Sequence, residues 1–439
     1  MLERRTFLAL VGSMAAGVSL SALGGCASAQ DAGSPTKGSS NPVGTAPSQA
    51  SLGPDSLFCS GLPTGRELWR IDARDMAVSA TSIWAVSEST LLSVDAGGLT
   101  SAVCDFNGVQ ALRVTASDAC VCVALDDGSL ACVDAKTGQL LWTASVVDAA
   151  GSTQTAEVSD GSRPTWTAIP VIMDETAAYA LFSSTAFEPS CWMGALALAD
   201  GNIVWRQPLS YAAQMANGIV GSWRLAGDAI LTTTGGGVVD AIDARTGANI
   251  GAVDAEGWVT GGITRRMDSG YLIQLADGTI VSFAFADGSF THVSIHRLTD
   301  AAPTVSGVHY VRPIDLGDAI ICRVPADVYE EASDGSAARM KMTLGIVDAE
   351  SFDVLDRLDD MDPQRQPLLL EASDGTALYV AAGNLLHRVE LEGTSFGAAS
   401  SLGVSVLDSE GSMYPEPLWC ESVPAMLMPV GTGAFAAIG

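Results

Sequence analysis

Three cysteines lie close together in the sequence and could in principle bind a metal ion. Cys120 and Cys122 are separated by one residue, and Cys132 follows ten residues later. A structural zinc site needs four ligands, usually supplied by two paired motifs or by cysteines with histidines. No second pair and no histidine lies nearby. We therefore expect the three cysteines to be small buried hydrophobic residues, with zinc binding as the alternative.

Histidines and one acidic run are the other candidates for chemistry. His292 and His296 are four residues apart, a spacing that separates two side chains on one strand by about 13 Å. Residues 359–362 lack the alternating acidic spacing and turn glycine of calcium loops, so a solvated acidic turn is expected there. The chain has neither the His-Glu-x-x-His nor the Gly-x-x-x-x-Gly-Lys motif. The sequence thus predicts no catalytic residue, no metal site and no cofactor.

The N-terminus has the features of an export signal. Arg4 and Arg5 precede an apolar stretch of small residues that ends in Leu-Gly-Gly-Cys at Cys26. This ending resembles the lipobox of bacterial lipoproteins, in which the cysteine is acylated and becomes the first residue of the mature chain. Arg4 and Arg5 also resemble the twin-arginine export signature, with a general export signal as the alternative. We expect residues 1–25 to be removed and Cys26 to anchor the protein to a membrane.

Composition narrows the function further. The chain has 439 residues, 48% of them hydrophobic, and a formal net charge of −28. The apolar content excludes a disordered chain, and the acidic charge disfavours nucleic acid as a partner. Residues 26–56 are rich in Ser, Gly, Pro and Ala, which predicts a flexible linker between the lipid anchor and a body spanning residues 57–439.

A hairpin motif recurs along this body. Between Leu130 and Trp142, one apolar run is followed by a polar turn ending in Thr-Gly and by a second apolar run. Similar units recur at a set of equivalent turn positions, namely Gly65, Gly98, Gly138, Gly201, Gly247, Gly288, Phe352 and Gly393. Four of the seven spacings are 40–46 residues, which is the length of a four-stranded propeller blade. The sequence therefore predicts an all-β fold, a β-propeller with antiparallel blades.

The two ends of the body predict how the ring closes. Residues 66–72 look like the outermost strand of a blade without the three strands that should precede it, whereas residues 416–438 look like a blade without its outermost strand. Joining the two removes an open sheet edge and completes an eighth blade. A seven-bladed ring is the alternative, if the unit at Phe352 is an irregular loop.

The repeat resembles that of the pyrroloquinoline-quinone-like propellers. The resemblance rests on the pattern Val-Asp-Ala-Lys-Thr-Gly-x-x-x-Trp at residues 133–142. This superfamily includes quinoprotein dehydrogenases and BamB-like lipoproteins of outer-membrane β-barrel assembly. Trp69, Trp142 and Trp205 keep the family's tryptophan position, which the resemblance implies packs between neighbouring blades. The other units place different residues there, namely Ala102, Gly251, His292, Asp356 and Gly397.

The cysteines bear on both disulfides and cofactors. Without Cys26, eight cysteines remain, an even number that is compatible with disulfides in an exported chain. The predicted topology brings Cys59 and Cys420 into one sheet, so we expect a disulfide between them. Family members that use the quinone cofactor commonly have two adjacent cysteines and a calcium site. No two cysteines are adjacent here, so the resemblance does not imply a cofactor.

The expected function is that of a lipid-anchored scaffold outside the cytoplasm, at the cell surface or in the periplasm, which binds an envelope protein and does no chemistry. Two long stretches, residues 143–170 and 296–340, predict loops that could carry the binding surface. The BamB-like resemblance implies a role in outer-membrane β-barrel assembly, which requires an organism with two membranes. The alternative is a quinoprotein-like oxidoreductase, or a binder of small molecules or carbohydrates, that uses the central channel.

Overall fold

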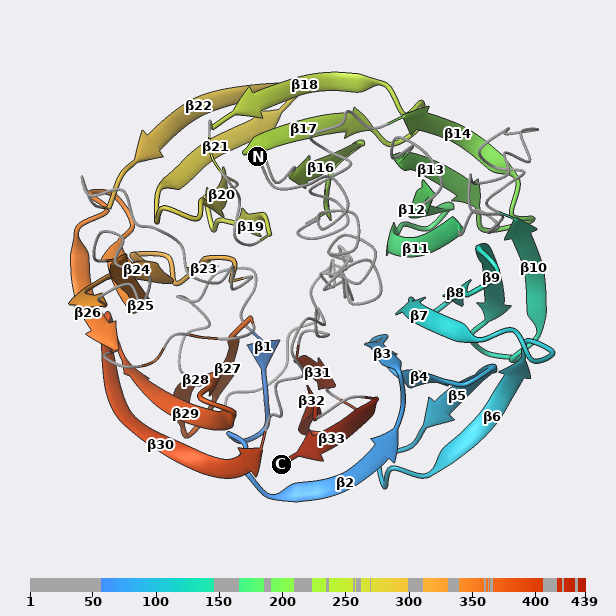
Figure 1. Ribbon diagram of the computed structural model, residues 1–439, viewed down its shortest axis with the longest axis horizontal. Helices are drawn as coiled ribbons and strands as arrows, with labels where there is room; N and C mark the ends of the chain where they lie inside the picture. Colours follow the sequence, from blue (N-terminus) through green and yellow to red (C-terminus); the bar gives the residue numbers. More distant parts are fainter. Residues whose placement is uncertain are drawn as a thin grey trace, which may run out of the picture.

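The described residues form eight β-sheets that surround a central axis as the blades of a propeller (Figure 1). The computed structural model describes residues 57–145, 166–184, 191–208, 223–233, 237–255, 257, 262–268, 270–298, 311–330, 339–358, 361, 363, 366–405, 417–420, 422–430 and 433–439. Each blade has four antiparallel strands, and one blade has a fifth strand. The predicted eight-bladed all-β propeller is confirmed, and the seven-bladed alternative is wrong.

The first four blades follow one another along the chain. Blade 1 contains β3 (Asp75–Val78), β4 (Ile83–Ser87), β5 (Thr90–Val94) and β6 (Thr100–Asp105). Blade 2 contains β7 (Ala111–Ala116), β8 (Cys120–Leu125), β9 (Ser129–Asp134) and β10 (Leu140–Ser145). Blade 3 contains β11 (Trp166–Met173), β12 (Ala177–Ser184), β13 (Cys191–Ala197) and β14 (Ile203–Pro208). Blade 4 contains β15 (Trp223–Ala226), β16 (Ala229–Thr233), β17 (Val238–Asp243) and β18 (Asn249–Asp254).

The last four blades include both ends of the described chain. Blade 5 contains β19 (Thr264–Arg265), β20 (Gly270–Gln274), β21 (Ile280–Ala286) and β22 (Ser289–His296). Blade 6 contains β23 (Ile314–Asp315), β24 (Ala319–Glu330), β25 (Arg339–Asp348) and β26 (Val354–Leu358). Blade 7 contains β27 (Leu368–Ala372), β28 (Gly375–Ala382), β29 (Leu385–Glu392), β30 (Ser395–Ser405) and the added β1 (Leu57–Phe58). Blade 8 contains β31 (Leu418–Cys420), β32 (Ala425–Pro429), β33 (Ala434–Ile438) and β2 (Glu67–Asp72).

The polar turn between the third and fourth strands explains the repeat in the sequence. In blade 2, one carboxylate oxygen of Asp134 accepts hydrogen bonds from the backbone N–H groups of Lys136 (3.1 Å) and Thr137 (2.7 Å). Gly138 then adopts a positive φ of 70°, which costs glycine little. Positive φ occurs at all eight predicted turn positions, including Phe352 at 60°. The unit at Phe352 is therefore a complete blade and not a loop.

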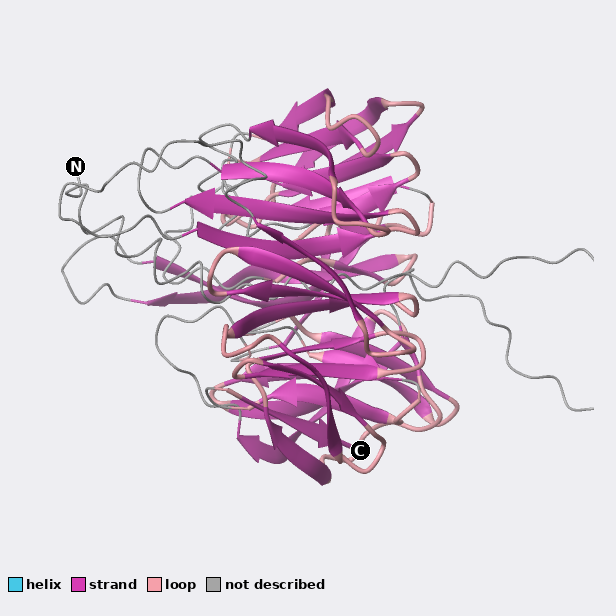
Figure 2. Ribbon diagram, turned by 90° about the vertical axis from the view of Figure 1, so that its right-hand side faces the viewer, coloured by secondary structure: helices cyan, strands magenta, loops and turns pink. Residues whose placement is uncertain are grey.

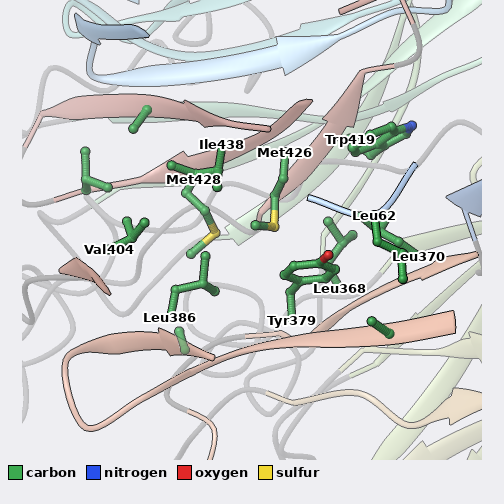
Figure 3. Close-up of a cluster of buried hydrophobic side chains, with 14 residues drawn as sticks. Leu62, Leu368, Leu370, Tyr379, Leu386, Val404, Trp419, Met426, Met428 and Ile438 are labelled. Atoms are coloured by element: carbon green, nitrogen blue, oxygen red, sulfur yellow. The ribbon is translucent and has the colours of Figure 1, made fainter. Parts of the chain in front are cut away.

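The hydrophobic core lies between neighbouring blades. The middle strands are mostly apolar, as in β8, where all six residues are buried. The fourth strands alternate instead, because one of their faces contacts the next blade and the other faces solvent. Figure 3 shows the seam between blades 7 and 8, where Tyr379 and Met426 lie in one buried cluster. Each blade is thus held in place mainly by apolar packing against its neighbours.

Strands from the two ends of the chain close the ring, as predicted. Trp69 of β2 lies opposite Ala437 of β33 in antiparallel register. The backbone N–H groups of Thr64 and Arg66 both donate to the carbonyl of Gly439, at 3.0 and 3.2 Å. Pairing β2 with β33 gives blade 8 its outermost strand, so this blade also has four strands.

The short strand β1 corrects the disulfide prediction. β1 pairs in parallel with β27, the innermost strand of blade 7, with Leu57 opposite Leu370 (Figure 1). Cys59 follows β1, and its N–H donates to the carbonyl of Glu371 at 2.8 Å. Cys420 ends β31 in blade 8, and both cysteines are free thiols. The expected Cys59–Cys420 disulfide is not formed, because β1 joins blade 7 and leaves Cys59 outside the closing blade.

Within a blade, the turn between the first and second strands and the turn between the third and fourth strands lie on the same side of the ring. We call this side the hairpin face. In blade 2 these turns comprise residues 117–119 and 135–139, and the N–H of Ala135 donates to the carbonyl of Ala119 at 3.0 Å. The edge-on view in Figure 2 shows most of these loops at one side of the strands. Within the described part of the chain, no helix has the length and apolarity needed to cross a membrane.

Candidate interaction surface

Each of the three tryptophans Trp69, Trp142 and Trp205 contacts a turn of the next blade. The indole N–H of Trp142 in blade 2 donates to the carbonyl of Leu198 in blade 3 at 2.8 Å. A Cβ atom on Gly201, in the turn that follows Leu198, would lie 2.6 Å from the Trp142 ring. The glycine is therefore required both for its positive φ and for the close approach of the ring. Trp205 makes the same contact with Ala244 (2.8 Å), and Trp69 with Ala96 (3.0 Å).

Two seams without tryptophan differ from the sequence prediction. In β6 a bulge shifts the register by one residue, so that Val103 and not Ala102 contacts the turn glycine Gly138. In β22 a bulge leaves His292 exposed with a φ of 52°, and His296 stacks on Phe352 of blade 6 with ring centroids 3.8 Å apart. The burial of His296 lowers its pKa.

The outer rim of the ring carries exposed aliphatic side chains. Where a tryptophan points into the seam, the residue before it must point outward. On β10 and β14 a bulge just before the tryptophan leaves two consecutive residues exposed. We call these four the apolar rim: Leu140, Leu141, Ile203 and Val204, which are 48%, 46%, 39% and 55% exposed. Trp142 contacts Gly201 just ahead of β14, so the two pairs lie on the outer strands of neighbouring blades. Solitary exposed aliphatic residues are common on surfaces, but pairs on neighbouring edge strands are typical of a protein-binding patch.

The hairpin face beside this rim is strongly acidic. Nearly every described turn on it carries a carboxylate, including Asp95, Asp118, Asp134, Asp174, Glu175, Asp200, Asp228, Asp243, Asp268, Asp287, Asp318, Asp348, Glu350, Asp374 and Glu392. Some of these carboxylates also stabilise their own turns, and hydrogen bonds from Thr137 hold the pKa of Asp134 below its usual value. Such a face attracts cationic partners and repels anionic ones.

A hollow of about 640 Å³ lies on the hairpin face between blades 8, 1 and 2. Its polar lining includes Thr81, Asp95 and Lys136, one of only three lysines in the chain. Asp95 is already engaged, since its carboxylate accepts the N–H groups of Gly97 (2.9 Å) and Leu99 (2.8 Å). The hollow could hold a small polar molecule, but its lining combines no nucleophile with a neighbouring base.

Buried charges join the inner strands of neighbouring blades, and sequence reasoning missed them. Asp75 of β3 accepts the N–H of Val114 of β7 at 3.0 Å, and the Arg113 guanidinium lies 3.8 Å from the same carboxylate. In blade 6, Asp315 accepts the N–H of Met267 of blade 5 at 2.8 Å, and burial raises its pKa. The one feature of the sequence that could have indicated this ion pair is that Asp75 and Arg113 are about one repeat apart.

One catalytic pattern in the sequence was also missed. Residues 393–397 read Gly-Thr-Ser-Phe-Gly, the spacing of a hydrolase nucleophile elbow. That motif requires a turn from a strand into a helix. Here Gly393 lies in the hairpin between β29 and β30, and Ser395 pairs with Glu392 across it. The segment is a hairpin turn and lacks the geometry of the elbow.

The remaining predicted residues are only partly within the structure. Arg4, Arg5 and Cys26 lie outside the described residues. The first expected loop is bounded by β10 and β11, and residues 146–165 are not described. The second, at 296–340, was expected as a loop, but it contains the strands β23 and β24 and the start of β25. The mainly apolar run 319–324 within that stretch forms part of β24, the second strand of blade 6.

Other proteins share this architecture. A family model described as outer membrane protein assembly factor BamB matches residues 56–175, which cover the closing strand β2, blades 1 and 2 and the start of blade 3. No curated protein sequence matches the chain. BamB from Moraxella catarrhalis is similar in structure, with a TM-score of 0.52 and 13% identity over 85% of this chain and 97% of its own.

Two quinohemoprotein alcohol dehydrogenases are also similar in structure. That of Comamonas testosteroni has a TM-score of 0.56 and 11% identity, over 88% of this chain and 78% of its own. ADHIIG from Pseudomonas putida HK5 has a TM-score of 0.50 and 10% identity, over 85% and 73%. At such identities the likeness shows the fold alone. The eight blades and these likenesses show that the chain has the eight-bladed propeller fold of BamB and the quinohemoprotein dehydrogenases, and its residues 56–175 match the BamB family model.

Proposed function

We propose that this protein is an exported, lipid-anchored scaffold that binds another protein of the cell envelope, with outer-membrane β-barrel assembly as the process it serves. The apolar rim is the observation that carries the proposal. The family match supports it, because the matching model describes an outer membrane protein assembly factor and covers blade 2, which contains Leu140 and Leu141.

The β10 part of the rim is suited to binding because it lies on an unprotected sheet edge, whereas β14 carries Arg206 and Pro208. Edge strands are usually kept from pairing with other chains by charged residues or proline. Strand β10, with the sequence Leu-Leu-Trp-Thr-Ala-Ser, has neither. Four exposed aliphatic side chains could contribute several kcal/mol to an interface, since full burial of each gives about 1.5–3 kcal/mol before the costs of association.

The acidic hairpin face defines the partner further. Its carboxylates adjoin the rim, so a fitting partner has an apolar patch flanked by lysine or arginine side chains. Charge of this kind mainly accelerates association, and added salt screens it. We therefore expect complex formation to slow as ionic strength rises, while the apolar contact limits dissociation.

Export and anchoring belong to the same proposal. The lipobox-like ending at Cys26 and the arginines Arg4 and Arg5 support export, and residues 26–56 supply a linker long enough to hold the ring away from the bilayer. A Cys26→Ser variant should appear in the soluble extracytoplasmic fraction, whereas the unaltered chain should sediment with membranes and carry a lipid-modified N-terminal peptide. Recovery of both proteins in the same fraction would contradict the anchor.

The alternative is a quinoprotein-like oxidoreductase or a small-molecule binder, which the likeness to the two dehydrogenases and the 640 Å³ hollow favour. The residues present do not fit a quinone–calcium pair. The described part of the chain has no group of three acidic, cysteine or histidine side chains that could hold a metal ion, and the sequence has no adjacent cysteines. Calorimetry with calcium and pyrroloquinoline quinone tests this alternative, and stoichiometric binding would favour it.

A comparison of two variants tests the scaffold. In one, the four rim residues are replaced by serine, and in the other Val293 and Ile295 of β22, which are similarly exposed (46% and 52%), are replaced by serine. Quantitative mass spectrometry of proteins captured from an envelope extract should show one partner that the unaltered chain and the β22 variant retain and the rim variant loses. Equal capture by all three would contradict a rim-based interface.

A further inference from the structure

Blade 2 is unusual in what it places at the centre of its sheet. Cys122 of β8 and Cys132 of β9 are direct partners in the antiparallel register. In five of the other blades the equivalent positions pair apolar residues without a thiol: Ala85 with Leu92, Tyr179 with Ala195, Leu231 with Ala241, Ile321 with Ile346, and Leu427 with Ala437. Apolar packing therefore does not itself require two cysteines at this place.

The hydrogen-bond pattern brings these two side chains close together. The N–H of Ala135 points toward β8 and donates to the carbonyl of Ala119. The N–H of Asp134 points the opposite way, toward β10, and donates to the carbonyl of Gln139. Because donors alternate along a strand, the pair Cys122–Cys132 is of the kind that is not hydrogen-bonded. Cα atoms in such pairs are about 4.5 Å apart. A disulfide accepts Cα separations of about 4.4–6.8 Å, so this pair meets the requirement.

A third thiol completes the group. Cys120 lies two residues before Cys122 on the same side of β8, and its sulfur lies 3.8 Å from the Ser117 hydroxyl. All three cysteines are buried in one cluster with Trp142 and with apolar residues of blade 3. The neighbouring Cys122 and Cys132 thiols lower the pKa of Cys120, and Cys120 raises the pKa of both Cys122 and Cys132. The strand register places Cys132 opposite Cys122, and all three cysteines lie in one buried cluster.

We propose that Cys122 and Cys132 are a thiol–disulfide pair, which a low-molecular-weight disulfide such as oxidised glutathione converts into a cross-strand bond. While the sheet is open, as during refolding, one cysteine thiolate attacks the oxidant's disulfide, forms a mixed disulfide and releases one glutathione thiolate. The second cysteine thiolate attacks the bonded protein sulfur and releases the other. Both cysteine S–H bonds are lost, one protein disulfide forms, and the two released protons convert the glutathione thiolates into thiols.

The position of this pair gives the bond a structural consequence. Cys132 is also the register partner of Trp142 on β10, the residue that follows Leu141 of the apolar rim. Oxidation would therefore connect β8 covalently to the strand that supports the rim. The inference is independent of the proposed partner, since it concerns only the state of the two sulfur atoms.

Peptide mapping tests the pair directly. The purified full chain is equilibrated in a glutathione redox buffer, both from the folded reduced protein and during refolding, and free thiols are then alkylated. Cleavage before aspartate separates residues 118–125 from 127–133. Oxidised samples should contain these two peptides joined, with two hydrogens fewer than their sum, and reduction should separate them.

Three variants identify the sulfur atoms involved. Cys122→Ala should abolish the joined peptides, whereas Cys120→Ala should retain them. Cys322→Ala is the matched control, because Cys322 is equally buried and faces Gly345 in the register, so the link should persist. The proposal is overturned if no joined peptide forms from either starting state, or if the link survives Cys122→Ala and disappears in Cys120→Ala.

Discussion

The buried ion pair between blades 1 and 2 makes a quantitative prediction. Asp75 is 1% exposed and Arg113 is 7% exposed, and their charged groups lie 3.8 Å apart. Burial lowers the pKa of Arg113, while Asp75 opposes that shift. Replacing Asp75 with Asn keeps an acceptor for the Val114 N–H but removes the negative charge beside the guanidinium. Breaking one side of a buried pair costs about 3–5 kcal/mol of unfolding free energy.

Urea unfolding measures this cost. For a slope of about 3–4 kcal/mol per molar urea, the midpoint should fall by about 1 M. Asp228→Asn is the matched control, because its ion pair with Arg245 is 3.0 Å long but both side chains are more than three-quarters exposed, so less than about 1 kcal/mol is expected. The double variant Asp75→Asn/Arg113→Met should recover much of the loss. Equal midpoints for Asp75→Asn and Asp228→Asn would refute the reasoning.

Three further predictions concern the seams. Gly201→Ala should lower the melting temperature more than Gly288→Ala does. Both glycines have a φ near 70°, which costs alanine about 1–2 kcal/mol, but of the two only Gly201 would place the new Cβ against a ring, that of Trp142. Equal shifts in melting temperature would contradict the close approach. Trp142→Ala should cost about 3–5 kcal/mol by chemical denaturation, because it removes a buried ring and its hydrogen bond; a loss below about 1 kcal/mol would show that the seam can collapse. Because the pKa of His296 is lowered in the folded protein, the unfolded chain binds a proton more readily at this residue. The stability that neutral His296 contributes is therefore fully present above the unfolded pKa of about 6.5 and is lost as the pH falls toward the folded pKa. His296→Phe should therefore flatten the fall in melting temperature between pH 7.5 and 5.5, and an unchanged fall in this variant would contradict the role of His296.

The blade count was predictable because the turn chemistry repeats. An aspartate that accepts neighbouring N–H groups and a glycine with positive φ recur at most turns between the third and fourth strands, and both leave a trace in the sequence, as at Asp134 and Gly138. Phe352 shows where the rule weakens, since a phenylalanine adopts the same conformation and stacks on His296. The fold thus followed from local backbone requirements that few residue types satisfy.

Other features depend on contacts that the sequence does not record. Strand β1 is two residues long and has no alternation, so nothing indicated that it would pair with β27, and the disulfide prediction failed for that reason. A one-residue bulge exchanged Ala102 for Val103 at a seam. The apolar rim was also missed, because Leu141 looks like part of an ordinary strand until the inward position of Trp142 shows which way it points.

Site-specific photo-crosslinking tests the central claim most directly. A photoreactive residue is placed at position 141 on the apolar rim or at position 101, a similarly exposed site on the outer strand β6, and the cells are irradiated intact. The account predicts one defined protein adduct at position 141 that is absent at position 101 and that disappears when Ile203 and Val204 are replaced by serine. No adduct at position 141, or the same adduct at both positions, would contradict a scaffold that binds through this rim.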